Sequence, residues 1–133
     1  MTSNDIILDT NAVLRFLVGD KPDKTQMVSE LLDKADCIIT TEVIVEAVYN
    51  LDKYYGHSRD MISEKIKDFI SIKKDLVLNE SVVRYGCNVF ASTNLDFIDC
   101  ILLGYANVNG NKVFSFDDLL NKKLEHKAIN SFL

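Results

Sequence analysis

The 133-residue sequence has no long apolar run, and this absence excludes a membrane-spanning protein. Its apolar stretches are far shorter than the ~18 residues that cross a bilayer. The opening residues, MTSNDIIL, also lack the basic start of a secretory signal. We therefore expect a cytoplasmic protein that is not associated with a membrane.

Cysteine is scarce and odd in number, which argues against a disulfide framework or a zinc site. Cys37, Cys87 and Cys100 are widely spaced and stand in apolar surroundings. Free cysteine in such surroundings behaves as a small apolar side chain. We expect three reduced thiols in the core.

Positive charge is in deficit, since the chain carries a formal net charge of −5. Sequence-independent binding of nucleic acid depends on Lys and Arg neutralising phosphates. The deficit therefore excludes a general nucleic-acid coating protein. A local basic rim or a bound metal ion could still offset it.

The chain also lacks repeats, low-complexity tracts and linkers, and Pro22 is its only proline. With 47% hydrophobic residues, 133 residues are enough for one core. We expect a single domain across residues 1–133.

Short apolar strands alternate with amphipathic helices along the whole length. Strands are predicted at residues 6–8, 36–41 and 76–79, a turn and a fourth strand at 109–116, and a weak edge strand at 126–133. Helices are predicted at residues 11–18, 23–34, 42–55, 59–71, 81–92, 96–107 and 117–124. This alternation predicts an α/β fold, a three-layer α/β/α sandwich around a mainly parallel sheet of four to five strands.

Polar residues follow the first strand directly. Residues 6–8 are continuously apolar, which is typical of a strand covered on both faces, and Asp9, Thr10 and Asn11 come next. In open α/β sheets, ligands bind at the carboxyl ends of the strands. The sequence therefore places a candidate site at this edge.

Further acids gather near the same edge. Asp117 follows the fourth predicted strand, and Glu46 lies one turn inside the helix after the second strand. Asp96 and Asp99 share one helical face. Glu46 and Asp99 have apolar neighbours in sequence, where an unpaired charge is costly, so both are expected to be buried and to need a partner.

Each acid also has a simpler structural explanation. Asp9 and Asp117 are favoured helix N-cap residues, and Thr93 forms a capping-box pattern with Asp96. Glu42 suits the first turn of its helix, whereas Glu46 has no cation close in sequence. Four converging carboxylates require a cation, and oxygen ligands favour Mg²⁺ or Mn²⁺ over zinc.

Four stretches, LDTNAVLRFLVGD, VEAVYNL, DFIDCILL and VFSFDDLLNKK, resemble the motifs of PIN domains, most closely those of VapC-type toxins of bacterial and archaeal toxin–antitoxin pairs. The resemblance covers nearly the full length, in the family's order. It places the family's acidic quartet on Asp9, Glu46, Asp99 and Asp117. Thr10 and Asn11 match the family's Asp-Thr-Asn opening, and Ser115 stands where Thr or Ser is usual. Cys100 is a mild departure, because alanine is commoner there.

The resemblance implies an endoribonuclease that depends on Mg²⁺ or Mn²⁺ and cleaves RNA with a metal-activated water. Asp9 and Asp99 would be the principal ligands, with Asp117 a ligand directly or through water. Glu46 would bind metal or orient the attacking water. Asn11 and Ser115 would orient the carboxylates.

The resemblance also implies an antitoxin bound near helices 11–18 and 23–34, and a homodimer. These helices carry more large apolar residues than one buried face can hold. By contrast, the spacing of Tyr49, Tyr54 and Tyr55 is more typical of packing than of base stacking.

Three alternatives stay open. One is a PIN-domain RNA-processing nuclease without an antitoxin, and another is a non-catalytic PIN-like binding module, which would be expected to lose acids. The third is a phosphatase of the haloacid dehalogenase type. That family requires a second Asp two positions after the first, where this chain has Asn11.

Overall fold

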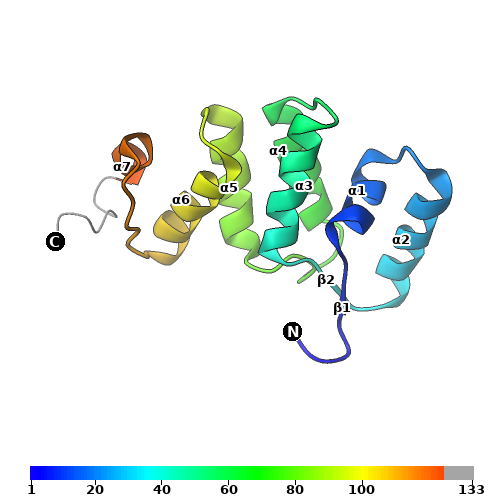
Figure 1. Ribbon diagram of the computed structural model, residues 1–133. Coiled ribbons are helices and arrows are strands. Elements are labelled where there is room, and N and C mark those ends of the chain that lie inside the picture. Colours follow the sequence, from blue (N-terminus) through cyan, green and yellow to red (C-terminus); the bar gives the residue numbers. More distant parts are fainter. Residues whose placement is uncertain (125–133) are drawn as a thin grey trace. The chain divides into compact units, whose positions relative to one another are not determined.

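The computed structural model describes residues 1–124 and shows an α/β fold in which helices predominate (Figure 1). The elements in chain order are β1 (Ile6–Ile7), α1 (Thr10–Val18), α2 (Pro22–Lys34), β2 (Cys37–Ile38), α3 (Thr41–Lys53), α4 (Arg59–Ile70), α5 (Glu80–Ser92), α6 (Phe97–Asn109) and α7 (Asp118–Leu124). Every predicted helix is present, with ends within about two residues of the prediction. No helix in this part of the chain is long and apolar enough to cross a membrane.

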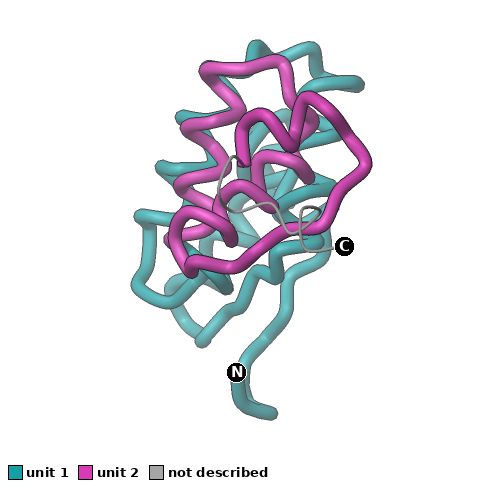
Figure 2. Tube along the Cα trace, turned by 90° about the vertical axis from the view of Figure 1, so that its left-hand side faces the viewer, with its two compact units in different colours: residues 1–80 teal, residues 81–133 magenta. Residues whose placement is uncertain are grey.

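The chain divides into two compact units, which Figure 2 colours separately. Unit 1 covers residues 1–80 and contains the two strands with α1 to α4. Unit 2 begins at residue 81 and contains most of α5 together with α6 and α7. The single domain expected from the sequence stays a prediction.

The sheet of unit 1 is parallel and small. Ile6 pairs with Cys37, and Ile7 pairs with Ile38. The predicted strand at residues 76–79 is reduced to one parallel bridge between Val77 and Ile39. Within residues 1–124 the sheet therefore has two strands, and the predicted sheet of four to five strands is not confirmed.

Residues 109–116, predicted as a turn followed by the fourth strand, contain no strand among the described residues. α6 continues to Asn109, Gly110 ends it with a positive φ of 75°, and the following residues hold only one bridge position, at Val113. Side-chain alternation indicates extended backbone, whereas a strand also needs a neighbour for its backbone N–H and C=O groups. The weak strand predicted at residues 126–133 lies outside the described residues.

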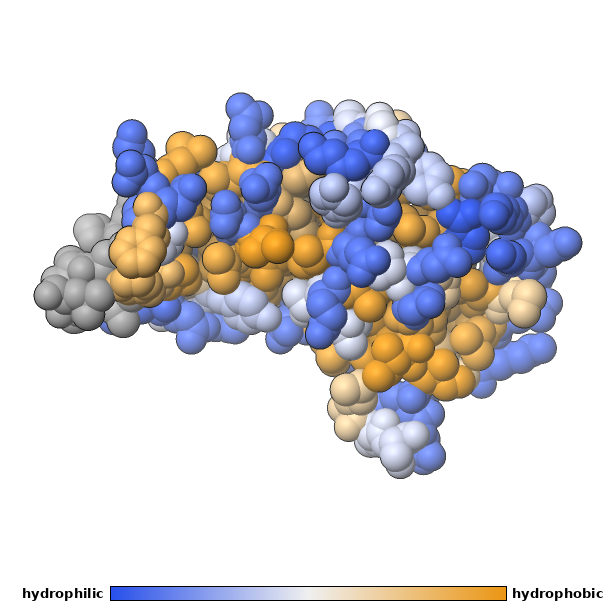
Figure 3. All heavy atoms as spheres, in the orientation of Figure 1, coloured by the Kyte–Doolittle hydropathy of each residue, from blue (hydrophilic) through white to orange (hydrophobic). Residues whose placement is uncertain are grey.

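The first strand is less covered than its apolar sequence suggests. Leu8 is 3% exposed, but Ile6 and Ile7 are 39% and 54% exposed. Figure 3 shows the corresponding apolar surface in orange around the strand pair. The expectation of a strand covered on both faces is therefore wrong for β1 in the described residues.

Helix packing forms the core of unit 1. α1 packs against α2 and α3, and α3 packs against α4. The apolar face predicted for α3 is the buried one, formed by Ile44, Ala47, Val48 and Leu51. This packing fixes the direction of the opposite, solvent-facing side of α3.

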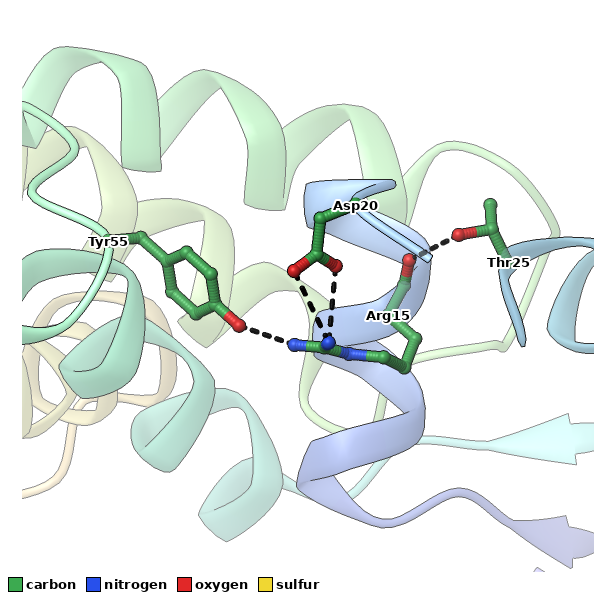
Figure 4. Close-up of polar contacts among 4 residues, drawn as sticks. All are labelled: Arg15, Asp20, Thr25 and Tyr55. Carbon is green, nitrogen blue, oxygen red and sulfur yellow. Dashed lines mark hydrogen bonds and ion pairs between the residues drawn. The ribbon is translucent and has the colours of Figure 1, made fainter. Parts of the chain in front are cut away.

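A buried arginine, which the sequence analysis did not identify, anchors the end of α1. The Arg15 guanidinium forms an ion pair with Asp20, at 3.1 Å from Nη1 to Oδ1, and donates to the Tyr55 hydroxyl (Figure 4). The Thr25 hydroxyl donates to the Arg15 carbonyl at 2.7 Å. These contacts connect α1 to α2 and to the segment after α3.

Unit 2 contains a close approach of two helices. A Cβ atom at Gly104 of α6 would lie 2.7 Å from the carbonyl oxygen of Val82 on α5. Cys87 and Cys100 are buried on the same two helices, and Cys37 is buried on β2. The expectation of three buried cysteines outside any disulfide is confirmed.

Candidate functional site

Asp9 stands at the junction between β1 and α1. Its Oδ1 accepts a hydrogen bond from the Ala12 backbone N–H at 2.8 Å, so it is the N-cap of α1. The side chain is exposed, with Thr10 half-buried and Asn11 exposed in the first turn beyond it. The cap fixes the direction of one carboxylate oxygen, while the residue as a whole stays exposed.

The two parallel strands bring the beginnings of α1 and α3 to the same edge. Leu8 N–H donates to the Ile38 carbonyl at 3.2 Å, so the carboxyl ends of β1 and β2 lie together. α1 begins at Thr10 and α3 at Thr41, each within three residues of its strand. Asp9 and the start of α3 therefore lie at the strand-end edge of unit 1, and the site predicted there stays a prediction.

Glu46 is exposed, and the prediction that it is buried among valines is wrong. The buried residues of α3 are Ile44, Ala47, Val48 and Leu51, and a position two residues after Ile44 lies on nearly the opposite side of the helix. Val43 and Val45 adjoin Glu46 in sequence but do not enclose it. The Asn50 side-chain amide donates to the Glu46 carbonyl at 2.8 Å.

The Glu42 carboxylate accepts hydrogen bonds at the start of α3, as expected for an acid in the first turn of a helix. Its own backbone N–H and the Thr40 side chain donate hydrogen bonds to its carboxylate, and these lower its pKa. The structural explanation given for Glu42 is therefore confirmed. Glu42 and Glu46 differ in surroundings, although both lie on the exposed side of α3.

Asp99 lies half-buried in the first turn of α6. Burial raises the pKa of its carboxyl, and the negative charges of Asp117 and Asp96 raise it further. The negative charges of Asp117 and Asp96 therefore reach Asp99 within unit 2.

Asp96 is the N-cap residue of α6 by position, but its side chain makes no cap hydrogen bond. The Thr93 hydroxyl instead donates to the Val89 carbonyl at 2.8 Å. The capping box predicted from Thr93 and Asp96 is therefore not formed. The Asp96 carboxylate is available to act on Asp99 electrostatically.

Asp117 precedes α7 and is held from two sides. Its Oδ1 accepts a hydrogen bond from Leu120 N–H at 2.7 Å, and its own N–H donates to Ser115 Oγ at 2.9 Å. The sequence analysis missed Asn121, whose side-chain amide donates to the Ser115 carbonyl at 2.9 Å. Its position four residues after Asp117, one helical turn on, was the available signal.

The structure thus divides the predicted acids between its two units. Asp9 and Glu46 belong to unit 1, and Asp96, Asp99 and Asp117 belong to unit 2. Within residues 1–124, no three His, Cys, Asp or Glu side chains are grouped closely enough to hold a metal ion. The donor set consists of carboxylates alone, which suits a hard divalent cation such as Mg²⁺ or Mn²⁺.

Comparison with known proteins gives two matches. The PIN domain family model matches residues 6–123. The chain is similar to a VapC ribonuclease of Aquifex aeolicus (strain VF5), with 29% identity over 131 residues that cover 95% of this chain and 96% of the relative. No solved structure gives a significant match.

Proposed function

Because the chain belongs to the PIN domain family, we propose that it is a divalent-metal-dependent endoribonuclease and the toxin of a toxin–antitoxin pair. The observation that carries the proposal is the extent of the family match, since residues 6–123 include all four acids of the quartet. The relative named VapC ribonuclease, similar over nearly its whole length, supports RNA as the substrate. Membership of the PIN family leaves no place for the haloacid dehalogenase alternative.

The donor chemistry fits a divalent cation. Asp9, Asp99 and Asp117 would hold it, and Glu46 would bind it or orient the attacking water. Asp9 and Asp117 each use one carboxylate oxygen to accept a backbone N–H, which limits side-chain rotation and orients the second oxygen. When bound, the cation lowers the pKa of a water and neutralises charge on the scissile phosphate.

The chain's own residues supply positioning and proton handling. Ser115 and Asn121 fix the backbone on which Asp117 stands. An ionised carboxylate of the quartet accepts the proton of the attacking water. Because water attacks, the products carry a 5′-phosphate and a 3′-hydroxyl.

The single domain with a sheet of four to five strands, predicted from the sequence, is part of the same proposal. β1 presents Ile6 and Ile7, and the segment that precedes α7 presents Phe114 and Phe116, which are 46% and 88% exposed. Apolar side chains of this kind become buried when a sheet gains strands. A sheet of four to five strands in one domain would gather the four acids at one edge.

An antitoxin and a second copy of the chain are the proposed protein partners. On α1 and α2, Phe16, Leu17, Val28 and Leu31 are only half-buried, and Met27 is 69% exposed. This apolar remainder supports the earlier assignment of the antitoxin to residues 11–18 and 23–34. An RNA substrate and three cysteines that form no disulfide fit a reducing cytoplasm.

Cleavage of RNA by the purified full chain tests the proposal. We expect cleavage with Mg²⁺ or Mn²⁺, loss of cleavage in excess EDTA, and recovery when the metal is restored. We expect 5′-phosphate and 3′-hydroxyl ends, and no activity in the Asp9→Asn variant while its circular dichroism is unchanged. Undiminished cleavage in EDTA, or 2′,3′-cyclic phosphate ends, would contradict the mechanism.

A further inference from the structure

We propose that Tyr49 and Tyr54, here called the tyrosine pair, form a stacking platform for unpaired RNA bases beside Glu46. The inference rests on the proposed function and deepens it, because it names single-stranded or looped RNA as the substrate class. It assigns a binding role to two side chains outside the acidic quartet.

The tyrosine pair is exposed and internally ordered. Tyr49 is 53% exposed and Tyr54 is 75% exposed, so the packing role expected from their spacing is wrong for both. Their rings stand edge to face, with centroids 6.3 Å apart and planes at 76°. This geometry holds each ring in place and leaves ring faces open to a base. Tyr55 is different, because its hydroxyl is bonded to Arg15.

α3 sets the distance between the tyrosine pair and Glu46. Glu46, Tyr49 and Lys53 stand at positions i, i+3 and i+7 and are all exposed, so they share the solvent-facing side of the helix. Helical rise puts Tyr49 ~4.5 Å and Tyr54 ~12 Å along the axis from Glu46. At ~3.4 Å per stacked nucleotide, these two distances correspond to roughly one nucleotide for Tyr49 and three to four for Tyr54. A strand passing Glu46 would therefore place its next bases over the tyrosine pair.

Charged side chains lie beside the tyrosine pair, namely the acids Glu46 and Asp52 and the cation Lys53. The Lys53 side chain is 60% exposed, and its ion pair with Asp52 has an N–O distance of 3.8 Å. An exposed pair of that kind is weak, so a phosphate can compete for Lys53. The cores of protein interfaces are depleted in charged residues, whereas Glu46 and Lys53 directly flank the tyrosine pair. Aromatic rings beside a cation are the usual means of holding single-stranded nucleic acid.

The platform requires unpaired bases, because the stacked base pairs of a duplex hide the faces of their bases. Double-stranded RNA presents backbone and groove edges, whereas bases in loops and single strands can stack on aromatic side chains. The platform therefore selects loops and single strands. It also provides a local attraction that does not depend on the overall charge of −5.

Equilibrium binding of a single-stranded RNA oligonucleotide of mixed sequence tests the proposal. Binding is measured by fluorescence anisotropy with the full chain carrying Asp99→Asn, so that the RNA stays intact. Tyr49→Ala and Tyr54→Ala are expected to weaken binding about 5- to 100-fold each, with Tyr49→Phe and Tyr54→Phe close to the parent. Met61→Ala, which removes an exposed methionine side chain on α4, is the matched control and should bind normally.

Intrinsic fluorescence gives a second readout. The chain has five tyrosines and no tryptophan, so its emission comes from tyrosine. Single-stranded RNA should quench part of this emission, and the quenched part should disappear in the double alanine variant. The duplex form of the same RNA should quench much less.

The outcomes separate this inference from the proposed function. If the alanine variants bind single-stranded RNA as the parent does, the platform is wrong, while metal-dependent cleavage by the wild-type chain leaves the nuclease intact. If the alanine variants lose affinity only because a dimer dissociates, as seen by sedimentation, the tyrosine pair is a protein interface and the inference is again wrong. If the wild-type chain neither binds nor cleaves RNA, the proposed function itself fails.

Discussion

Asp99 is the acid whose ionisation the fold opposes most clearly. Its pKa is raised above the ordinary value of 3.8 by burial and by Asp117 and Asp96, so the folded chain holds its proton more tightly than the unfolded chain does. Its contribution to stability is therefore fully present below the ordinary pKa and is lost as the pH rises through the raised value. Without metal, an ionised Asp99 destabilises the fold at neutral pH.

The Asp99→Asn variant tests this linkage, because asparagine resembles the protonated acid. In EDTA we expect the variant to be more stable than the wild type at about pH 7, and the difference to shrink towards about pH 3. Urea unfolding followed by circular dichroism measures both values. A variant that is less stable at neutral pH would show that the carboxylate is held by favourable contacts instead.

Glu46 and Glu42 form a matched pair, since both are exposed acids on α3, one turn apart. Glu46→Gln should reduce cleavage about 10- to 100-fold or more, as expected for a group that binds metal or orients water. Glu42→Gln should leave cleavage nearly unchanged and cause a small loss of stability, because it loses hydrogen bonds at the start of the helix. Initial rates and melting temperatures measure the two effects. Equal losses of cleavage would mean that the second motif is misplaced.

Among the helices, α5 and α6 offer the sharpest test of packing. A Cβ at Gly104 would lie 2.7 Å from the backbone oxygen of Val82, which moves only if α5 moves. A Cβ at Gly86 would lie 3.0 Å from Cδ1 of Ile101, the flexible end of a side chain.

We therefore expect Gly104→Ala to be less stable than Gly86→Ala by about 1–3 kcal/mol, the usual cost of overpacking. Both substitutions gain the same helix propensity of about 1 kcal/mol, so their difference isolates the clash. Chemical denaturation measures it. Equal stability would show that α5 and α6 can separate at little cost.

Helices were predictable from this sequence because their signal is local. The apolar face of α3 could be identified from the spacing of Ile44, Ala47, Val48 and Leu51 alone, and it is the buried face. Strands were less predictable, because pairing depends on distant residues. Val77 pairs at a single position, and residues 109–116 do not form a strand.

The residues of the candidate site stay a prediction, but the surroundings of two side chains on α3 can be compared with what the sequence suggested. Neighbours in sequence suggested that Glu46 is enclosed, whereas the helix turns Val43 and Val45 away from it. The same rotation exposes Tyr49, which the spacing of aromatic residues had suggested was packed. In both cases, the position relative to the buried face of α3 was more informative than the adjacent residues.

For the chain as a whole, a divalent cation should link metal binding to folding stability. If Asp9, Asp99 and Asp117 hold one cation, Mn²⁺ should raise the melting temperature. At an Mn²⁺ concentration of 100 times the dissociation constant, the free energy of unfolding should increase by about 2.7 kcal/mol. Asp9→Asn should abolish this rise although it lies in unit 1, and Asp117→Asn should abolish it from unit 2. Differential scanning calorimetry with and without Mn²⁺ measures the effect. A rise that survives Asp9→Asn would place the metal on unit 2 alone.

The three buried cysteines also allow transient opening of the folded chain to be measured by thiol labelling. Cys37 belongs to unit 1, and Cys87 and Cys100 belong to unit 2, with exposures of 4%, 0% and 0%. A thiol reagent can reach them only when the surrounding structure opens transiently. Mass spectrometry after brief labelling therefore counts the opening events of each unit separately. Chains that are either fully labelled or unlabelled would mean that both units open in one cooperative step, whereas chains labelled only at Cys87 and Cys100 would mean that unit 2 opens alone.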